Sequence, residues 1–365
     1  MAALALKEKL VTIKPIEMGG SRAANRLEYQ RDYALCCLIE LHLKKRDYRI
    51  LFDYHDDIVI LFPSNEPSEL HFYQVKTDRT NNWSLGRLLK RKNPKGGISL
   101  SILGKMFSLF QKFAEHTASL NFVSNANFNF KLKDQSKSLA KNEIYLIDLA
   151  QQEFEVAKKK ITDELSFELT DELAKITVFK VSSLSLDDHS IHVLGKLTDF
   201  LVNKFNDPDP PANSLFRVLK GYIEKKQNSE IEPQTFGELF QSKSISYQEI
   251  ESILQSLSFK KKFAELWEEI RSNLQNENCN YKLIQDLHDE CDRYLLERTN
   301  PTNDLLQGVR QEIKNLLSDP NAHKDTLLGT VGHLAQGCPI GKKRISDLFS
   351  ETFFKAMILV EIYDK

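Results

Sequence analysis

Two short apolar runs carry a compact set of polar residues: HDDIVI at residues 55–60 and FYQVK at residues 72–76. Both runs are rich in β-branched or aromatic residues, and a segment with two prolines separates them, which predicts two neighbouring strands. Because side chains alternate along a strand, Gln74 and Lys76 project from one face. An acid at the start of the first strand can reach that face across the hairpin.

A carboxylate, an amide and a lysine at one point suit phosphodiester hydrolysis. Carboxylate, amide and backbone carbonyl oxygens are suitable ligands for a hard cation such as Mg²⁺ or Mn²⁺. The lysine can polarise a water molecule or neutralise developing charge. Asp56 and Asp57 both stand at the strand start, and alternation places only one of them on the site face. The pattern leaves open which one binds metal.

Outward from these strands, the first half of the chain mixes helical and strand patterns. Apolar residues at helical spacing predict a helix over residues 21–45, before the strands. Further helices are expected at 99–113, 151–173 and 192–205, and further strands at 122–123, 145–147 and 176–181. The mixture predicts an α/β domain.

The sequence DPDPP at residues 207–211 is the clearest structure breaker in the chain. After it the periodicity is helical nearly throughout, with no convincing strand. We therefore expect an α/β domain over residues 1–207, a linker over 208–213 and an all-α helical domain over 214–365.

The order of these motifs resembles a known group of nucleases. A helix with EYQ at residues 28–30, then DDI at 56–58, QVKT at 74–77 and Trp83 is similar to the PD-(D/E)xK superfamily, in the branch where Gln replaces the second acid. More narrowly, it resembles the double-strand DNA endonuclease domain of bacterial anti-phage defence, found in CBASS effectors and in the nuclease subunit of Lamassu systems. The resemblance implies a restriction-endonuclease-like fold and metal-dependent cleavage of double-stranded DNA.

The resemblance also implies roles for individual residues. Asp57 would bind metal, with Asp56 as the adjacent candidate. Gln74 would take the place of the second metal-side acid, and Lys76 would be the catalytic lysine. Gln30 occupies the helix position where related nucleases often carry Glu, which makes it a further catalytic candidate.

A basic stretch follows the candidate site. Residues 79–114 contain eight Lys or Arg and no acid. Such a stretch beside a nuclease site indicates contacts with the DNA backbone, which set affinity and not sequence choice. The predicted DNA-binding residues are Arg79, Arg87, Lys90, Arg91, Lys92 and Lys95.

Charge and cysteine content exclude several classes of protein. The formal net charge of the chain is −1, which excludes a uniformly basic nucleic-acid coat. Residues 1–205 hold 30 basic and 26 acidic side chains, whereas residues 206–365 hold 20 and 25. Five scattered cysteines without a CxxC pair favour a reduced, cytoplasmic protein. No apolar run approaches the ~20 residues that span a bilayer, so no membrane partner is expected.

The expected function is a gated endonuclease. The short helical second half favours control by a partner protein. The resemblance to Lamassu implies that the partners are an SMC-like ATPase and an accessory subunit, and we expect a homo-oligomer to form on activation. The apolar segment at residues 353–360 is a candidate face for burial against another chain. Two alternatives remain: an effector nuclease activated by a cyclic oligonucleotide, and a catalytically silent DNA-binding scaffold subunit.

Overall fold

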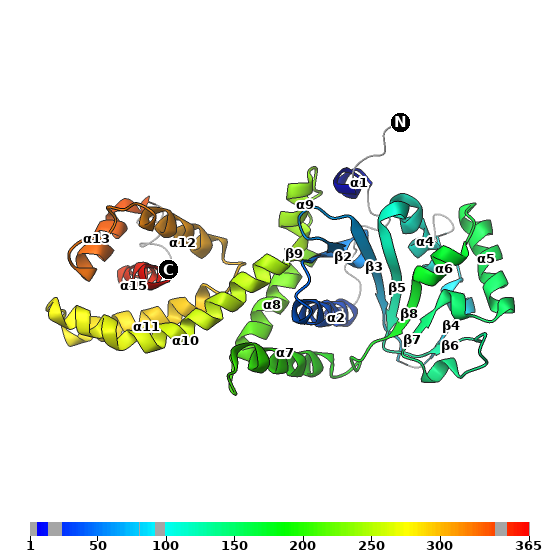
Figure 1. Ribbon diagram of the computed structural model, residues 1–365, viewed down its shortest axis with the longest axis horizontal. Coiled ribbons are helices and arrows are strands. Elements are labelled where there is room, and N and C mark those ends of the chain that lie inside the picture. Colours follow the sequence, from blue (N-terminus) through cyan, green and yellow to red (C-terminus); the bar gives the residue numbers. More distant parts are fainter. Residues whose placement is uncertain (1–5, 14–23, 80, 92–98, 340–348, 365) are drawn as a thin grey trace. The chain divides into compact units, whose positions relative to one another are not determined.

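The structure is a computed structural model that describes residues 6–13, 24–79, 81–91, 99–339 and 349–364. The chain divides into two compact units, Met1–Tyr247 and Gln248–Lys365, whose elements are labelled in Figure 1. The expected linker at residues 208–213 therefore lies inside the first unit. The reason is that a helix and a strand from residues 212–246 pack onto the first unit's sheet.

The first unit is built on a seven-stranded mixed sheet with the order β7-β8-β5-β3-β2-β1-β9. Neighbours β1, β2 and β3 are antiparallel, while β3, β5 and β8 run parallel. The strands are β1 (Arg49–Tyr54), β2 (Asp56–Phe62), β3 (Glu69–Lys76), β5 (Thr117–Ser124), β7 (Glu143–Tyr145), β8 (Thr177–Val181) and β9 (Ser244–Ser246). Two short strands, β4 (Trp83–Ser84) and β6 (Phe128–Asn129), form a separate parallel pair.

Helices cover both faces of this sheet (Figure 1). Helices α2, α7 and α8 lie on one side, and α4, α5 and α6 lie on the other. The helices of this unit are α1 (Leu6–Thr12), α2 (Ala24–Leu43), α3 (Leu85–Leu88), α4 (Ile102–Phe113), α5 (Gln151–Leu165), α6 (Asp171–Ile176), α7 (His189–Phe205), α8 (Ala212–Gln227) and α9 (Phe236–Lys243). Short 3-10 helices lie at Ala114–His116, Ser138–Ala140 and Leu146–Asp148.

The alternation of the central strands explains these layers. Val59 and Leu61 of β2 are buried in the same core cluster as Met106 and Phe107 of α4. The intervening residue, Ile60, is also buried. A strand that is apolar on both sides needs cover on both faces, which this arrangement supplies.

The second unit consists of helices among its described residues. They are α10 (Tyr247–Asn276, of which all but the first residue belong to this unit), α11 (Tyr281–Glu297), α12 (Asp304–Leu317), α13 (Leu327–Gly337) and α15 (Glu351–Tyr363). Helix α15 contacts α11, α12 and α13. The fold confirms the α/β and helical classes expected for the two halves.

The structure corrects the expectation for the apolar segment at residues 353–360. Phe353, Phe354 and the residues from Ala356 to Val360 are at most 1% exposed, because α15 is the central helix of its own unit. A helix that is apolar nearly all round is a buried helix. This segment therefore offers no surface to another chain.

Two further expectations differ from the structure. A strand, β9, does occur after the Pro-rich breaker and pairs antiparallel with β1. The helix expected over 151–173 ends at Leu165, because Ser166 adopts a left-handed conformation with φ 51°. Within the half expected to be helical, α10 runs without a break from Tyr247 to Asn276.

No helix in the described part of the chain has both the length and the apolar character needed to cross a membrane.

Candidate active site

A tight hairpin turn carries the two candidate acids. Tyr54 of β1 pairs with Asp56 of β2, and the single residue between them, His55, has φ 67°. The His55 ring is buried, and its Nε2 donates a hydrogen bond to the carbonyl oxygen of Leu10 in α1, at 3.0 Å. Burial lowers the pKa of His55 to about 4. The neutral ring therefore anchors the turn that precedes Asp56 and Asp57.

The site forms where β2 and β3 part. Their pairing begins at Ile58 and Tyr73, one residue after Asp57. After Tyr73, β3 has no backbone partner in β2. The carboxylate of Asp57 takes that place for Val75, because its Oδ2 accepts the backbone N–H of Val75 at 2.7 Å. The end of β3 is therefore held by the side chain of Asp57.

The structure brings Asp57, Gln74 and Lys76 together. The amide Nε2 of Gln74 donates to Asp57 Oδ2 at 2.6 Å, and Lys76 Nζ lies 3.1 Å from the same oxygen. The side chain of Asp57 is 13% exposed and that of Lys76 is 37% exposed. A partly buried carboxylate thus faces a lysine that solvent can still reach.

Asp56 adds a second carboxylate to the group. Its Oδ1 accepts the backbone N–H of Asp57 at 2.9 Å. Desolvation, and next the charge of Asp57, raise the pKa of Asp56 well above its usual range, while the charges of Lys76 and Lys105 act in the opposite direction. Two adjacent carboxylates in one desolvated place are costly without a bound cation, because each disfavours the charge of the other.

Gln30 reaches the same strand from α2. Its Nε2 donates to the carbonyl oxygen of Val75 at 3.2 Å, so the amide lies beside the Gln74–Lys76 segment. Glu28 does not join it, because its carboxylate forms an ion pair with Lys220 at 2.8 Å. This places Gln30, and not Glu28, at the candidate site.

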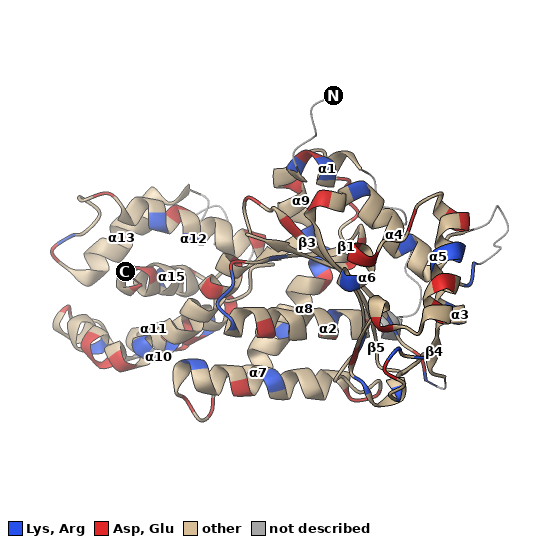
Figure 2. Cartoon of the chain, turned by 45° about the vertical axis from the view of Figure 1, so that its right-hand side comes forward, with Lys and Arg blue, Asp and Glu red and all other residues tan. Residues whose placement is uncertain are grey.

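The predicted DNA-binding residues have different surroundings. Arg79 forms an ion pair with Asp187 at 2.9 Å. Arg87 forms an ion pair with Asp78 at 2.5 Å, and its guanidinium lies over the ring of Trp83. Lys90 and Arg91 are exposed, whereas Lys92 and Lys95 lie outside the described residues. Figure 2 shows acidic and basic residues interspersed along the helices and loops. DNA binding by this stretch stays a prediction.

Residues distant in sequence complete the site and were missed by sequence reasoning. Lys105 of α4 lies close enough to influence the charge of Asp56. The side-chain amide of Asn125 pairs with both the N–H and the carbonyl of Asp78, at 3.0 and 2.8 Å, two residues after Lys76. Lys105 is one of the eight cations of the basic stretch, but no sequence pattern connects it with Asp56, and Asn125 belongs to no local pattern. Only the tertiary structure reveals where the two residues lie.

The donor set limits how a metal ion could be held. Among the described residues, His, Cys, Asp and Glu form no group of three or more that could ligate a metal. A cation at this site would therefore rely on Asp56 and Asp57 together with the Gln74 amide oxygen or a backbone carbonyl. Such an oxygen set suits Mg²⁺, which usually takes only one or two carboxylates and keeps several waters.

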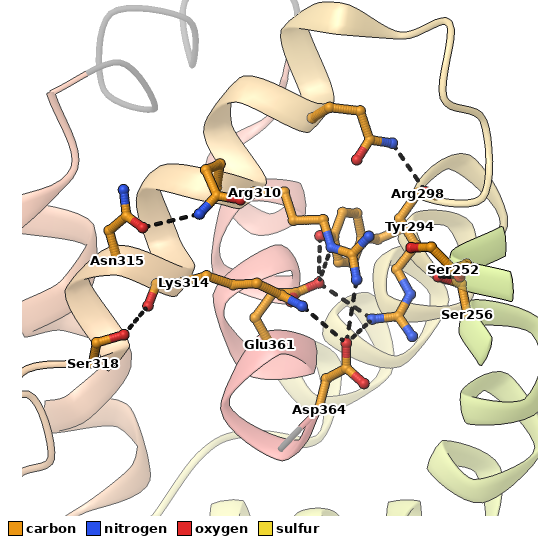
Figure 3. Close-up of polar contacts among 12 residues, drawn as sticks. Ser252, Ser256, Tyr294, Arg298, Arg310, Lys314, Asn315, Ser318, Glu361 and Asp364 are labelled. Atoms are coloured by element: carbon orange, nitrogen blue, oxygen red, sulfur yellow. Dashed lines mark hydrogen bonds and ion pairs between the residues drawn. The ribbon is translucent and has the colours of Figure 1, made fainter. Parts of the chain in front are cut away.

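The second unit also gathers carboxylates and cations, around Glu361 and Asp364 (Figure 3). The side chains of Glu361 and Arg298 are both 0% exposed. Nη1 of Arg298 lies 3.2 Å from Oε1 of Glu361. Arg310 and Lys314 of α12 approach the same two acids, as drawn in Figure 3. This group ties the C-terminal helix α15 to α12 and to Arg298, at the end of α11.

Two comparisons with known proteins found similar sequences. Residues 18–227 match the family described as Cap4, dsDNA endonuclease domain. The chain is also 24% identical over 319 residues to the Lamassu protein LmuA of Bacillus cereus (strain VD014), with 83% of this chain and 82% of that protein covered. The family match spans more than half of the chain and includes Gln30, both acids and the Gln74–Lys76 segment.

Proposed function

Because the chain belongs to the family of Cap4 dsDNA endonuclease domains, we propose that it is a metal-dependent endonuclease that cleaves double-stranded DNA in bacterial anti-phage defence. The observation that carries the proposal is that Gln74 and Lys76 both contact Oδ2 of Asp57, where β2 and β3 part. The same oxygen also accepts the backbone N–H of Val75. The proposal includes a restriction-endonuclease-like fold for the first unit.

The residues present fit a divalent cation. The pKa of Asp56 is raised by desolvation and by Asp57, so a cation would relieve the cost of holding both carboxylates ionised. With its Nε2 turned to Asp57, Gln74 has its amide oxygen left as a donor atom for metal. We assign Asp56, Asp57 and Gln74 as the residues that hold Mg²⁺ or Mn²⁺. When bound, the ion would supply Lewis-acid activation of the scissile phosphate and of the attacking water.

Lys76 performs the protein's own part of the chemistry. Its ammonium group is held in place by Asp57 and is accessible to a phosphodiester, since its side chain is 37% exposed. A fixed positive charge stabilises the charge that develops on the phosphate during hydrolysis. Besides holding the metal ion, Asp57 thus has two tasks: it orients Lys76 and it fixes the end of β3 through Val75.

Uncontrolled cleavage of DNA would damage the cell, so the proposed enzyme is held inactive by partners. These are an SMC-like ATPase and an accessory subunit of the same defence system. The similarity to a protein named for the Lamassu system supports membership of a multi-subunit system. The second unit is the proposed partner-binding region, through its outer helix surfaces and not through α15.

One such site hydrolyses one strand at a time. A double-strand break therefore needs two copies facing opposite strands, which closed symmetric pairing would supply. Activation would then be release from the partners followed by self-association. Light scattering with a parallel cleavage assay, with and without partners, tests this: complete cutting of both strands by a strictly monomeric protein would contradict it.

The nuclease proposal is tested by a Lys76→Ala variant. Purified wild-type and variant proteins are incubated with supercoiled plasmid and Mg²⁺ or Mn²⁺, and nicked and linear products are measured. Cleavage should be lost while the circular dichroism spectrum and melting temperature stay unchanged. The matched control is Lys141→Ala, which removes a lysine of similar, partial exposure that is paired with Asp134. Wild-type cleavage by Lys76→Ala would overturn the proposal.

A further inference from the structure

A buried polar network joins α2 to α7 and α8. We call Glu28, Asp32, His189, Ser190 and Lys220 the α2 network. Asp32 is 0% exposed, and its Oδ2 accepts hydrogen bonds from His189 Nδ1 and from Ser190 Oγ, each at 2.6 Å. A buried carboxylate is tolerated only when donors or cations surround it. The network therefore fixes the place of Asp32 firmly.

Lys220 of α8 connects the members of this network. Its Nζ lies 2.8 Å from the carboxylate of Glu28, 3.3 Å from that of Asp32 and 3.1 Å from Ser190 Oγ. Both acids belong to α2, whereas Ser190 lies in the first turn of α7. One ammonium group thus links three helices, and its side chain is only 21% exposed.

The two acids and Gln30 occupy opposite faces of α2. Glu28 and Asp32 are four residues apart, so they share one face of the helix. Gln30 lies two residues from each and points about 200° away from Glu28. The network holds one face of α2, and the opposite face places Gln30 Nε2 3.2 Å from the carbonyl oxygen of Val75.

The backbone of Val75 connects α2 with the candidate catalytic group. Its carbonyl accepts from Gln30, and its N–H donates to Asp57 Oδ2. Gln74 and Lys76, the neighbours of Val75 in sequence, both contact that same oxygen. A rotation of α2 would move Gln30, and the carbonyl of Val75 would then lose its hydrogen bond to the Gln30 amide.

We propose that Lys220 is a positioning residue for DNA cleavage: it sets the rotation of α2 and thereby holds Gln30 on the Val75 carbonyl, between Gln74 and Lys76. The inference rests on the proposed nuclease function of the Asp57–Lys76 group. A displacement of about 1 Å from catalytic geometry can cost up to about 100-fold in rate, so a residue that never meets DNA can still control turnover.

The first test is a comparison of Lys220→Met, Lys220→Arg and a matched control. Methionine keeps the apolar stem but removes the charge, while His189 and Ser190 still donate to Asp32, so the variant should fold. The control is Lys196→Met, because Lys196 also joins α7 to α2, through Glu40 at 3.2 Å, ten residues along α2 from Gln30. We expect kcat for plasmid cleavage to fall about tenfold in Lys220→Met, with DNA affinity unchanged. Lys220→Arg and Lys196→Met should stay close to wild type.

A double mutant separates positioning from general loss of stability. In a Gln30→Ala background, Lys220→Met should cause no further loss of kcat. Both changes remove the same contact, the hydrogen bond from Gln30 to the carbonyl of Val75. Independent effects would multiply. Multiplying losses, or an unchanged kcat in Lys220→Met, would overturn the inference.

Hydrogen exchange provides a readout that needs no activity. In the metal-free protein without DNA, amides over residues 70–77 should exchange faster in Lys220→Met than in wild type or Lys196→Met. Equal exchange in all three would overturn the inference. Retained cleavage by Lys76→Ala, in contrast, would overturn the proposed function, and the exchange experiment would still decide whether Lys220 controls the Val75 segment.

Discussion

Asp57 in the first unit and Glu361 in the second are both carboxylates beside cations, yet their surroundings differ. Asp57 contacts one lysine whose side chain is 37% exposed, and a second carboxylate, Asp56, adjoins it. Glu361 is 0% exposed and contacts Arg298 and Arg310, at 3.2 and 3.0 Å. The Tyr294 hydroxyl donates to Glu361 at 2.7 Å, which helps to satisfy the buried charge.

The difference suits the two carboxylates to different roles, a proposed functional one for Asp57 and a structural one for Glu361. Around Glu361, cations and a hydroxyl compensate the acid inside the unit, which suits a tie between helices. Around Asp57, the two acids contact one lysine, Lys76, with Lys105 farther off, and burial and the neighbouring charge of Asp57 still raise the pKa of Asp56. An unbalanced group at the ends of strands, reached by solvent, is the one suited to bind metal and substrate.

The largest expected effect comes from removing Asp57. Asp57→Ala should lower the rate of plasmid cleavage by about a thousand-fold or more, because Lys76 and the end of β3 lose their common anchor. Cleavage rates at saturating Mg²⁺ measure this, and Asp56→Ala is the comparison. An inactive Asp56→Ala beside an active Asp57→Ala would assign the principal metal ligand to Asp56.

Removing the charge of Glu361 should affect stability instead. Glu361→Gln leaves Arg298, Arg310 and Lys314 to share the carboxylate of Asp364, so the free energy of unfolding of the second unit should fall by about 3–5 kcal/mol. Urea unfolding followed by Trp267 fluorescence in a Trp83→Phe background reports on this unit.

The control for Glu361 is Glu297→Gln, which weakens an exposed ion pair with Arg293. Such pairs contribute about 1 kcal/mol or less. Equal losses in the two variants would remove the distinction between a buried structural cluster and ordinary surface charge.

The pH response of the first unit should depend on His55. Its pKa in the folded protein is about 4, below its ordinary value of 6.5, because burial disfavours the charged ring. The neutral form therefore stabilises the fold fully above about pH 6.5, and this contribution, up to about 3 kcal/mol, is lost as the pH falls toward 4.

A His55→Gln variant should show a smaller loss of stability between pH 7 and pH 4.5 than wild type. Urea unfolding followed by Trp83 fluorescence in a Trp267→Phe background measures the difference. An identical pH dependence in the two proteins would show that His55 does not anchor the hairpin in its neutral form.

Local patterns were sufficient to predict the centre of the site. Alternation along β3 places Gln74 and Lys76 on one face, and the turn at His55 brings Asp57 to them. The same alternation left Asp56 and Asp57 undecided. The structure puts both near Lys76, because the turn and the end of strand pairing interrupt regular alternation there.

Features made by distant contacts could not be predicted. Strand β9 has only three residues and lies almost two hundred positions from its partner β1, so no local pattern predicts it. The apolar character of α15 predicted burial correctly but not the chain against which it is buried. Lys220 likewise belongs to an ordinary helical pattern, and only the packing of α2 on α8 reveals its contacts.

The central claim is that the unbalanced group around Asp57, and not the compensated group around Glu361, binds the catalytic metal. Titration of Mn²⁺ into the DNA-free protein, followed by electron paramagnetic resonance, tests it in three proteins: wild type, Asp57→Asn and Glu361→Gln, each folded at the temperature used. We predict that wild type and Glu361→Gln bind Mn²⁺ with equal affinity and that Asp57→Asn does not bind. Retained binding in Asp57→Asn with loss in Glu361→Gln would contradict the account.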